Sequence, residues 1–193
     1  LFGALFLFNL IESMPKFVME GTLAYKYQLY FNALFFPAQA ILLSIGFVYK
    51  PQLLRLSNIW ANPRQRGRFD LIIVAVIVLI VVITGACAAF MAGPGIPIMS
   101  FMYGFNFESY RTLALLMVVA GGVTAAIDFI YAIITVLRHA GDVTKIYLIC
   151  FAVSVALPMV LIKLLGLMGA VVSYLAIMTL LLVLLIIEYA HIR

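Results

Sequence analysis

The stretch LIIVAVIVLIVVI, residues 71–83, decides the fold class of this chain. Its thirteen residues are all apolar, so it lacks the apolar/polar alternation of a transmembrane β-barrel strand. The apolar segment continues to residue 92, close to the roughly 20 residues that a helix needs to cross the hydrocarbon of a bilayer. Because lipid cannot hydrogen-bond an open backbone, a helix is the remaining way to span the membrane. The stretch therefore predicts a transmembrane helix over residues 71–92.

The composition extends this prediction to the whole chain. The 193 residues are 67% hydrophobic and 10% charged, against roughly 25% charged in a typical soluble domain, and the mean hydropathy is +1.23. A soluble fold of this length has too little interior to bury that much apolar surface. Cys87 and Cys150 lie in apolar runs without a metal-binding or redox spacing, and we expect both to be packing residues.

Four further stretches have the length and composition of spanning helices, namely residues 25–49, 112–137, 146–162 and 167–187. Residues 1–11 have the character of the tail of another. We therefore predict one all-α integral membrane domain over residues 1–193, a six-helix lobe of five complete transmembrane helices plus that tail. The last two helices are expected to face mostly lipid. The chain starts with Leu in an apolar segment, from which we expect it to be part of a longer protein.

The distribution of basic residues predicts the orientation. Five of the twelve Lys and Arg residues lie between Lys50 and Arg68, and such clusters accumulate in cytoplasmic loops. Alternation of the helices then places eight basic residues inside, these five with Arg138, Lys145 and Arg193. Only Lys16, Lys26, Arg111 and Lys163 fall outside. We predict a multi-pass protein of the cytoplasmic (inner) membrane with a cytoplasmic C-terminus.

The predicted helix 112–137 carries polar residues at spacings of three and four, which place them on one face. They are Gly121, Thr124, Asp128, Tyr131, Thr135 and Arg138. An Asp within a span costs about 2.5–3.5 kcal/mol on insertion scales. We expect Asp128, with Thr124 and Tyr131, to face a solvated cavity, where Asp128 binds a coupling proton or sodium ion or contacts substrate. The alternative is a protonated or hydrogen-bonded carboxyl that is merely structural.

The predicted helix 25–49 has a weaker polar face formed by Tyr25, Gln28, Asn32 and Gln39. We include Gln28, Asn32, Gln39, Lys26 and Lys16 among the candidate cavity residues. Hydrogen bonding between helices is the alternative for the amides, and Lys26 has the alternative of reaching the outer headgroups. In the helix over 71–92, small residues at 85, 89 and 93 predict a close approach to another helix.

No pattern typical of an enzyme is present in the sequence. His139 and His191 have no second ligand at a metal-binding spacing, paired acid/base carboxylates are missing, and no phosphate-binding glycine loop occurs. We expect no catalytic residues, no metal, no nucleic-acid partner and no cofactor beyond a possible coupling H+ or Na+.

Four stretches, taken together and in order, resemble the C-terminal half of Wzx-type polysaccharide (O-antigen) flippases of the multidrug/oligosaccharidyl-lipid/polysaccharide (MOP) exporter superfamily. They are SMPKFVMEGTLAYKYQLYFNALFFPAQAI (13–41), SIGFVYKPQLLRLSN (44–58), GIPIMSFMYGFNFESY (95–110) and LLGLMGAVVSYLAI (164–177). The first resembles the segment that joins the seventh and eighth family helices. Pro15-Lys16-Phe17 stands where Pro-Arg-Tyr is common in the family, which keeps the charge but loses the guanidinium fork and the phenol.

This resemblance implies the second lobe of a twelve-helix transporter with pseudo-two-fold symmetry. Its partners would be the N-terminal six-helix lobe, membrane lipids and the substrate, a polyprenyl-diphosphate-linked oligosaccharide for cell-surface polysaccharide biosynthesis. The substrate would be flipped by alternating access around a central cationic cavity.

Three further hypotheses remain open from the sequence alone. A drug/cation antiporter of the same superfamily would use Asp128 for coupling. A membrane-embedded transferase would need clustered His and Asp residues, which the sequence lacks. A structural subunit would have no water-accessible face at Asn32 or Asp128.

Overall fold

The computed structural model describes residues 2–137 and 140–192, and this part of the chain is helical with short turns and no strand. The helices are α1 (Phe2–Thr22), α2 (Tyr25–Tyr49), α3 (Leu53–Ala61), α4 (Arg66–Phe90), α5 (Ile96–Tyr103), α6 (Arg111–Val136), α7 (Ala140–Leu165) and α8 (Leu167–Ile192). Five helical stretches of the described residues are long and apolar enough to cross a membrane, and each overlaps one of the five predicted spans. The prediction of an all-α, multi-pass membrane protein is confirmed at this level.

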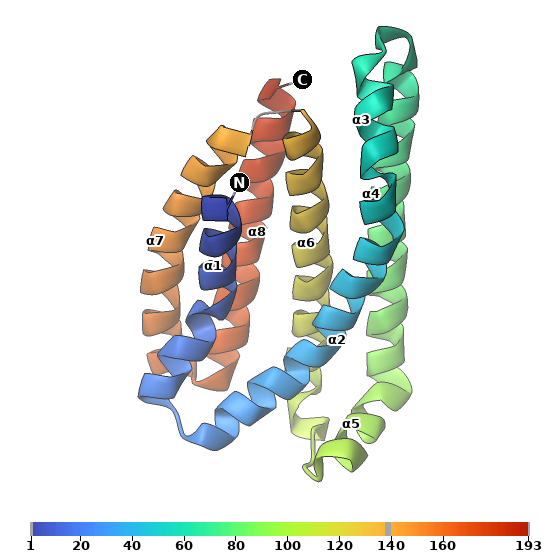
Figure 1. Ribbon diagram of the computed structural model, residues 1–193. Helices are drawn as coiled ribbons and strands as arrows, with labels where there is room; N and C mark the ends of the chain where they lie inside the picture. Colours follow the sequence, from blue (N-terminus) through green and yellow to red (C-terminus); the bar gives the residue numbers. More distant parts are fainter. Residues whose placement is uncertain (1, 138–139, 193) are drawn as a thin grey trace.

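The helices form an up-and-down bundle, in which spans consecutive in the sequence alternate in direction, with α6 and α8 at its centre (Figure 1). α1 and α7 pack together on one side of this centre, while α2 and α4 cover α6 on the other. α2 starts beside the end of α1 and then runs obliquely across α6, so α1 and α2 diverge along their length (Figure 1). The α3–α4 turn and the C-terminus lie at one end of the bundle, and the α1–α2 and α7–α8 turns lie at the other. This arrangement agrees with the predicted alternation of the helices.

Two helices come into close backbone contact where α2 crosses α6. A Cβ atom built on Gly121 would lie 2.6 Å from the backbone Cα of Ala38, so only glycine allows this approach. Nearby, Gly122 of α6 lies against the side chain of Thr84 in α4. The predicted small-residue contact of residues 85, 89 and 93 is wrong, because all three are exposed and the two glycines have no atom within 4 Å of a built Cβ. The close helix–helix contacts are made instead by the glycines of α6, Gly121 against α2 and Gly122 against α4.

Three predicted boundaries differ from the structure. α1 continues through Pro15 to Thr22, well beyond residue 11, because proline and polar residues are tolerated in helices that pack against other helices. After α4, a π-helical turn (Met91–Gly95) with non-helical torsion angles at Gly93 accommodates Pro94, and α5 continues to Tyr103. α7 already begins at Ala140 rather than at 146. An apolar stretch indicates the residues that can cross the hydrocarbon, whereas the helix itself continues beyond them.

The prediction that the last two helices mostly face lipid is wrong for α8. Ten of its residues are buried between α6, α7 and α1. A uniformly apolar sequence does not distinguish these positions, because lipid tails are as apolar as leucine. A tight turn precedes α8, with Gly166 at a φ of 59° between Leu165 and Leu167. Cys150 is buried and Cys87 is half-buried.

The α2–α6 crossing generates a stability prediction. Gly121→Ala should lower the thermal unfolding midpoint in detergent, because overpacking against the backbone of Ala38 costs about 1–3 kcal/mol. Gly85→Ala is the matched control, since a Cβ there meets open space and alanine favours a helix. Equal midpoints for the two variants would contradict the close crossing.

Candidate functional site

Asp128 of α6 joins the end of α2 through two polar contacts. The Tyr49 hydroxyl donates a hydrogen bond of 2.5 Å to Asp128 Oδ2, and Lys50 Nζ lies 3.5 Å from the same oxygen. Tyr49 is itself buried, with its ring 5.3 Å from that of Phe129. The Asp128 side chain remains 26% exposed. Asp128 is therefore bound to the end of α2 and still partly exposed.

Glu12 of α1 adds a second carboxylate to this region. It is half-buried and interacts electrostatically with Lys16, four residues further along α1, and with Asp128. Together with the ion pair at Asp128, this gives a series of charged side chains from α1 to the end of α2. We call this series the charge chain; its members are Lys16, Glu12, Asp128 and Lys50. It holds two cations and two carboxylates, with the two carboxylates in the middle.

A small pocket of about 120 Å³ lies between α1 and the first turns of α2. Its polar lining comes from Lys16, Glu20, Gln28 and Asn32. Gln28 Nε2 donates a long hydrogen bond of 3.5 Å to the Lys16 carbonyl, and Lys16 Nζ lies 4.6 Å from the ring centroid of Phe35. The structure thus brings together three of the predicted site residues, Lys16, Gln28 and Asn32. We call this the α1–α2 pocket.

Two other predicted residues, Thr124 and Tyr131, make packing contacts instead. Thr124 is buried, and its hydroxyl lies 2.9 Å from the Ala120 carbonyl and 3.1 Å from the Tyr174 hydroxyl of α8. Tyr131 is 8% exposed and its ring stands 5.9 Å from that of Tyr147 in α7. They do share a face with Asp128, as predicted, but that face is covered by α7 and α8 along much of its length. Neither residue lines the α1–α2 pocket.

The remaining predicted positions lie around this region. Gln39 is exposed on α2, seven residues after Asn32 and therefore on the same face. Lys26 is exposed near the α1–α2 turn, with Nζ 5.2 Å from the ring centroid of Tyr27. Arg138, His139 and Arg193 lie outside the described residues. Within the described ranges, no group of three or more His, Cys, Asp or Glu residues could hold a metal ion.

The sequence interpretation missed Glu12, Tyr49 and Lys50. The predicted helical tail over residues 1–11 stops just before Glu12, which α1 in fact includes. The spacing of Glu12 and Lys16, one helical turn apart, was the available signal. Tyr49 and Lys50 lie at the end of the apolar stretch of α2, and nothing in the sequence alone indicates that they contact Asp128 of α6.

No family model matches this chain, and neither curated proteins nor solved structures give a significant match. A functional assignment therefore rests on the residues themselves.

The exposure of the α1–α2 pocket generates a labelling prediction. In a background with Cys87→Ala and Cys150→Ala, a cysteine at position 32 should react with a membrane-impermeant maleimide, because only water-exposed thiols form thiolate readily. A cysteine at 124 should stay unlabelled because the site is buried. A cysteine at 82 is the control for lipid exposure, since Val82 is 59% exposed on the apolar α4. Equal labelling at 32 and 82 would contradict a water-filled pocket.

Proposed function

We propose that this chain forms one lobe of a membrane transporter that flips a lipid-linked oligosaccharide. The observation that carries the proposal is the charge chain, which runs through a bundle whose outer surface is apolar. Ionisable side chains within a membrane are costly and usually line a substrate or ion pathway. A purely structural bundle has no need of the two carboxylates, Glu12 and Asp128, within its helices.

The members of the charge chain come from α1, α6 and the end of α2, and α1 and α6 run in opposite directions (Figure 1). Asn32 and Gln28 extend the polar lining toward the α1–α2 turn. A sugar head group rich in hydroxyls needs such a series of donors and acceptors across the bilayer, while its polyprenyl tail stays in lipid.

The resemblance to the C-terminal half of Wzx-type flippases supports the same cargo and adds the second lobe. The charge chain has no net charge, so it does not by itself attract a diphosphate. In the proposed transporter, the cationic surplus of the central cavity comes from the N-terminal lobe. Lys16, at the α1–α2 pocket, is this lobe's candidate contact for the phosphate.

Asp128 has a role in alternation in this proposal. Its bonds to Tyr49 and Lys50 hold the end of α2 against α6. Binding of H+ or Na+ at this carboxylate would compete with Lys50 and weaken that attachment, so that α2 is free to move relative to α6. Coupling of this kind requires that α2 can adopt two arrangements relative to α6 and that the bound ion favours one of them.

A drug/cation antiporter of the same superfamily is the second candidate, and the electrostatic influence of Asp128 on Glu12 favours it. Two carboxylates within electrostatic range of each other suit one monovalent cation or a cationic drug better than an anionic diphosphate. The two candidates differ in which charges are essential. The flippase needs Lys16, and the antiporter needs the carboxylate pair.

These roles are tested in cells in which the complete parent gene is deleted and then restored with variants. Deletion should leave polyprenyl-linked oligosaccharide in the inner leaflet, and Lys16→Gln or Asp128→Asn should restore no more than about a tenth of flipping, as expected when a contact worth over 1.4 kcal/mol is lost. The readout is the share of glycolipid accessible to an external glycan-modifying enzyme.

Two variants control for the loss of a charge alone. Lys163→Gln and Glu108→Gln change exposed groups outside the charge chain and should flip normally. Normal flipping in the deletion strain, without a redundant flippase, would overturn the proposal. Efflux of an organic cation that is lost in both Glu12→Gln and Asp128→Asn, and kept in Lys16→Gln, would establish the antiporter instead.

A further inference from the structure

The α3–α4 hairpin, formed by α3 and the first turns of α4, projects beyond the rest of the bundle (Figure 1). α2 and α3 together make a nearly continuous helical stretch of 37 residues. At 1.5 Å per residue this stretch is about 55 Å long, whereas the hydrocarbon is about 30 Å thick. The tip of the hairpin therefore reaches the level of the lipid headgroups.

A depression of about 590 Å³ lies between the two helices of this hairpin. Its polar lining consists of Arg55 and Asn58 of α3, Asn62 and Gln65 of the turn, and Arg68 of α4. The Asn62 side-chain oxygen accepts a hydrogen bond of 3.3 Å from the backbone N–H of Arg64, which fixes the orientation of this amide. We call this depression the hairpin pocket.

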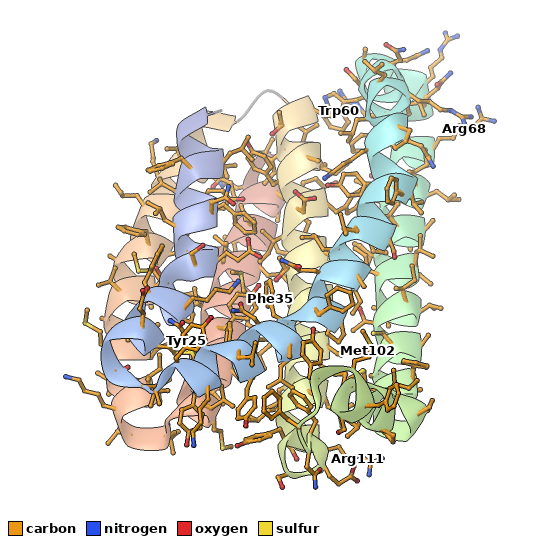
Figure 2. All side chains as sticks on the ribbon, turned by 60° about the horizontal axis from the view of Figure 1, so that its bottom comes forward. Tyr25, Phe35, Trp60, Arg68, Met102 and Arg111 are labelled. Atoms are coloured by element: carbon orange, nitrogen blue, oxygen red, sulfur yellow. The ribbon has the colours of Figure 1, made fainter. Side chains whose placement is uncertain are left out.

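The charge of the hairpin pocket suits an anion. Two guanidinium groups from different helices line it, and no carboxylate is among its lining residues. Residues 50–70 contain five Lys and Arg but a single acidic residue, Asp70. Guanidinium groups bind phosphate oxygens with two parallel hydrogen bonds, and the side-chain amides add neutral donors for further oxygens. Figure 2 shows Arg68 at the outer end of the hairpin.

The hairpin pocket also has an apolar side. Leu71 and Ile72 line it one helical turn after Arg68, and Leu71 is 70% exposed. Trp60, at the end of α3, stacks under Arg66 with the guanidinium carbon 4.9 Å from its ring, and Trp is enriched at the membrane–water interface. The pocket thus passes from guanidinium groups to apolar side chains within about 6 Å along α4, given the helical rise.

We propose that the hairpin pocket binds the phosphate of an anionic phospholipid. Arg55 and Arg68 would bind the phosphate, the amides would contact glycerol or headgroup hydroxyls, and Leu71 and Ile72 would contact the start of the acyl chains. The apolar side favours a lipid over a soluble phosphate, which has no group to place there. Basic pockets at the ends of transmembrane helices bind such headgroups in general. This site does not depend on which cargo the bundle transports.

The test compares lipid binding by the purified full chain and its variants, using native mass spectrometry or ligand-dependent thermal shifts. Phosphatidylglycerol should bind more tightly than phosphatidylcholine. Arg55→Gln with Arg68→Gln should weaken phosphatidylglycerol binding roughly thirty-fold, the effect expected for two charges at a lipid headgroup.

The matched control is Arg64→Gln with Arg66→Gln, which removes the same charge from the same hairpin but from residues outside the pocket lining. It should retain most of the affinity. Equal losses in the two double variants would overturn the proposal in favour of a diffuse electrostatic effect. Inorganic phosphate that binds as tightly as phosphatidylglycerol would also overturn it, because the site would then be one for a soluble anion.

Discussion

A polar side chain inside a bilayer must face other helices or water, and this constraint sets the arrangement of the whole bundle. α4 has no charged residue after Asp70 and exposes most of its surface. Asp128 of α6 instead forms an ion pair with Lys50 at the end of α2, within electrostatic range of Glu12 on α1. A bundle held together by apolar contacts alone gains little over lipid, because the surroundings are equally apolar. Close backbone approach and polar contacts therefore carry the specificity of this fold.

Two such contacts hold α2 in its oblique course. Near its middle, Gly121 lets the backbone of Ala38 approach α6. At its end, Tyr49 and Lys50 bind Asp128, also of α6. The first contact is steric and does not respond to ligands, whereas the second depends on the charge of one carboxylate. A helix that pivots at its middle and is released at its end suits the moving element of the proposed alternation, because a single ion would bias its two arrangements.

The sequence was sufficient to predict the fold class and the approximate position of five spans, because an uncharged apolar stretch of about 20 residues is long enough to cross the hydrocarbon and too apolar for most soluble helices. It was insufficient for the helix ends. In α1 and α7, polar residues continue the helix without any apolar signal, and before α5 the Gly and Pro residues of the π-helical turn interrupt the pattern although the helix continues. It also did not separate buried α8 from lipid-facing α4, because both are uniformly apolar.

The candidate site was predictable only in its individual residues. Asp128, Lys16, Gln28 and Asn32 stand out because they are polar within or beside apolar stretches. Their grouping was not predictable, because it depends on the divergence of α1 and α2 and on the return of Tyr49 to α6. For Thr124, the helical face on which it lies was predicted correctly. That this face is covered by the Tyr174 hydroxyl of α8 was not predictable, because the contact joins two distant parts of the chain.

The most direct test of the proposed pathway is site-specific photocrosslinking in cells that make the complete protein. A benzophenone amino acid at position 32, in the α1–α2 pocket, should form an adduct with radiolabelled polyprenyl-linked oligosaccharide, and the same probe at position 82 should not. The adduct at position 32 should also decrease when unlabelled glycolipid accumulates. Absence of a sugar-containing adduct at position 32, or equal adducts at the two positions, would contradict a glycolipid pathway between α1 and α2.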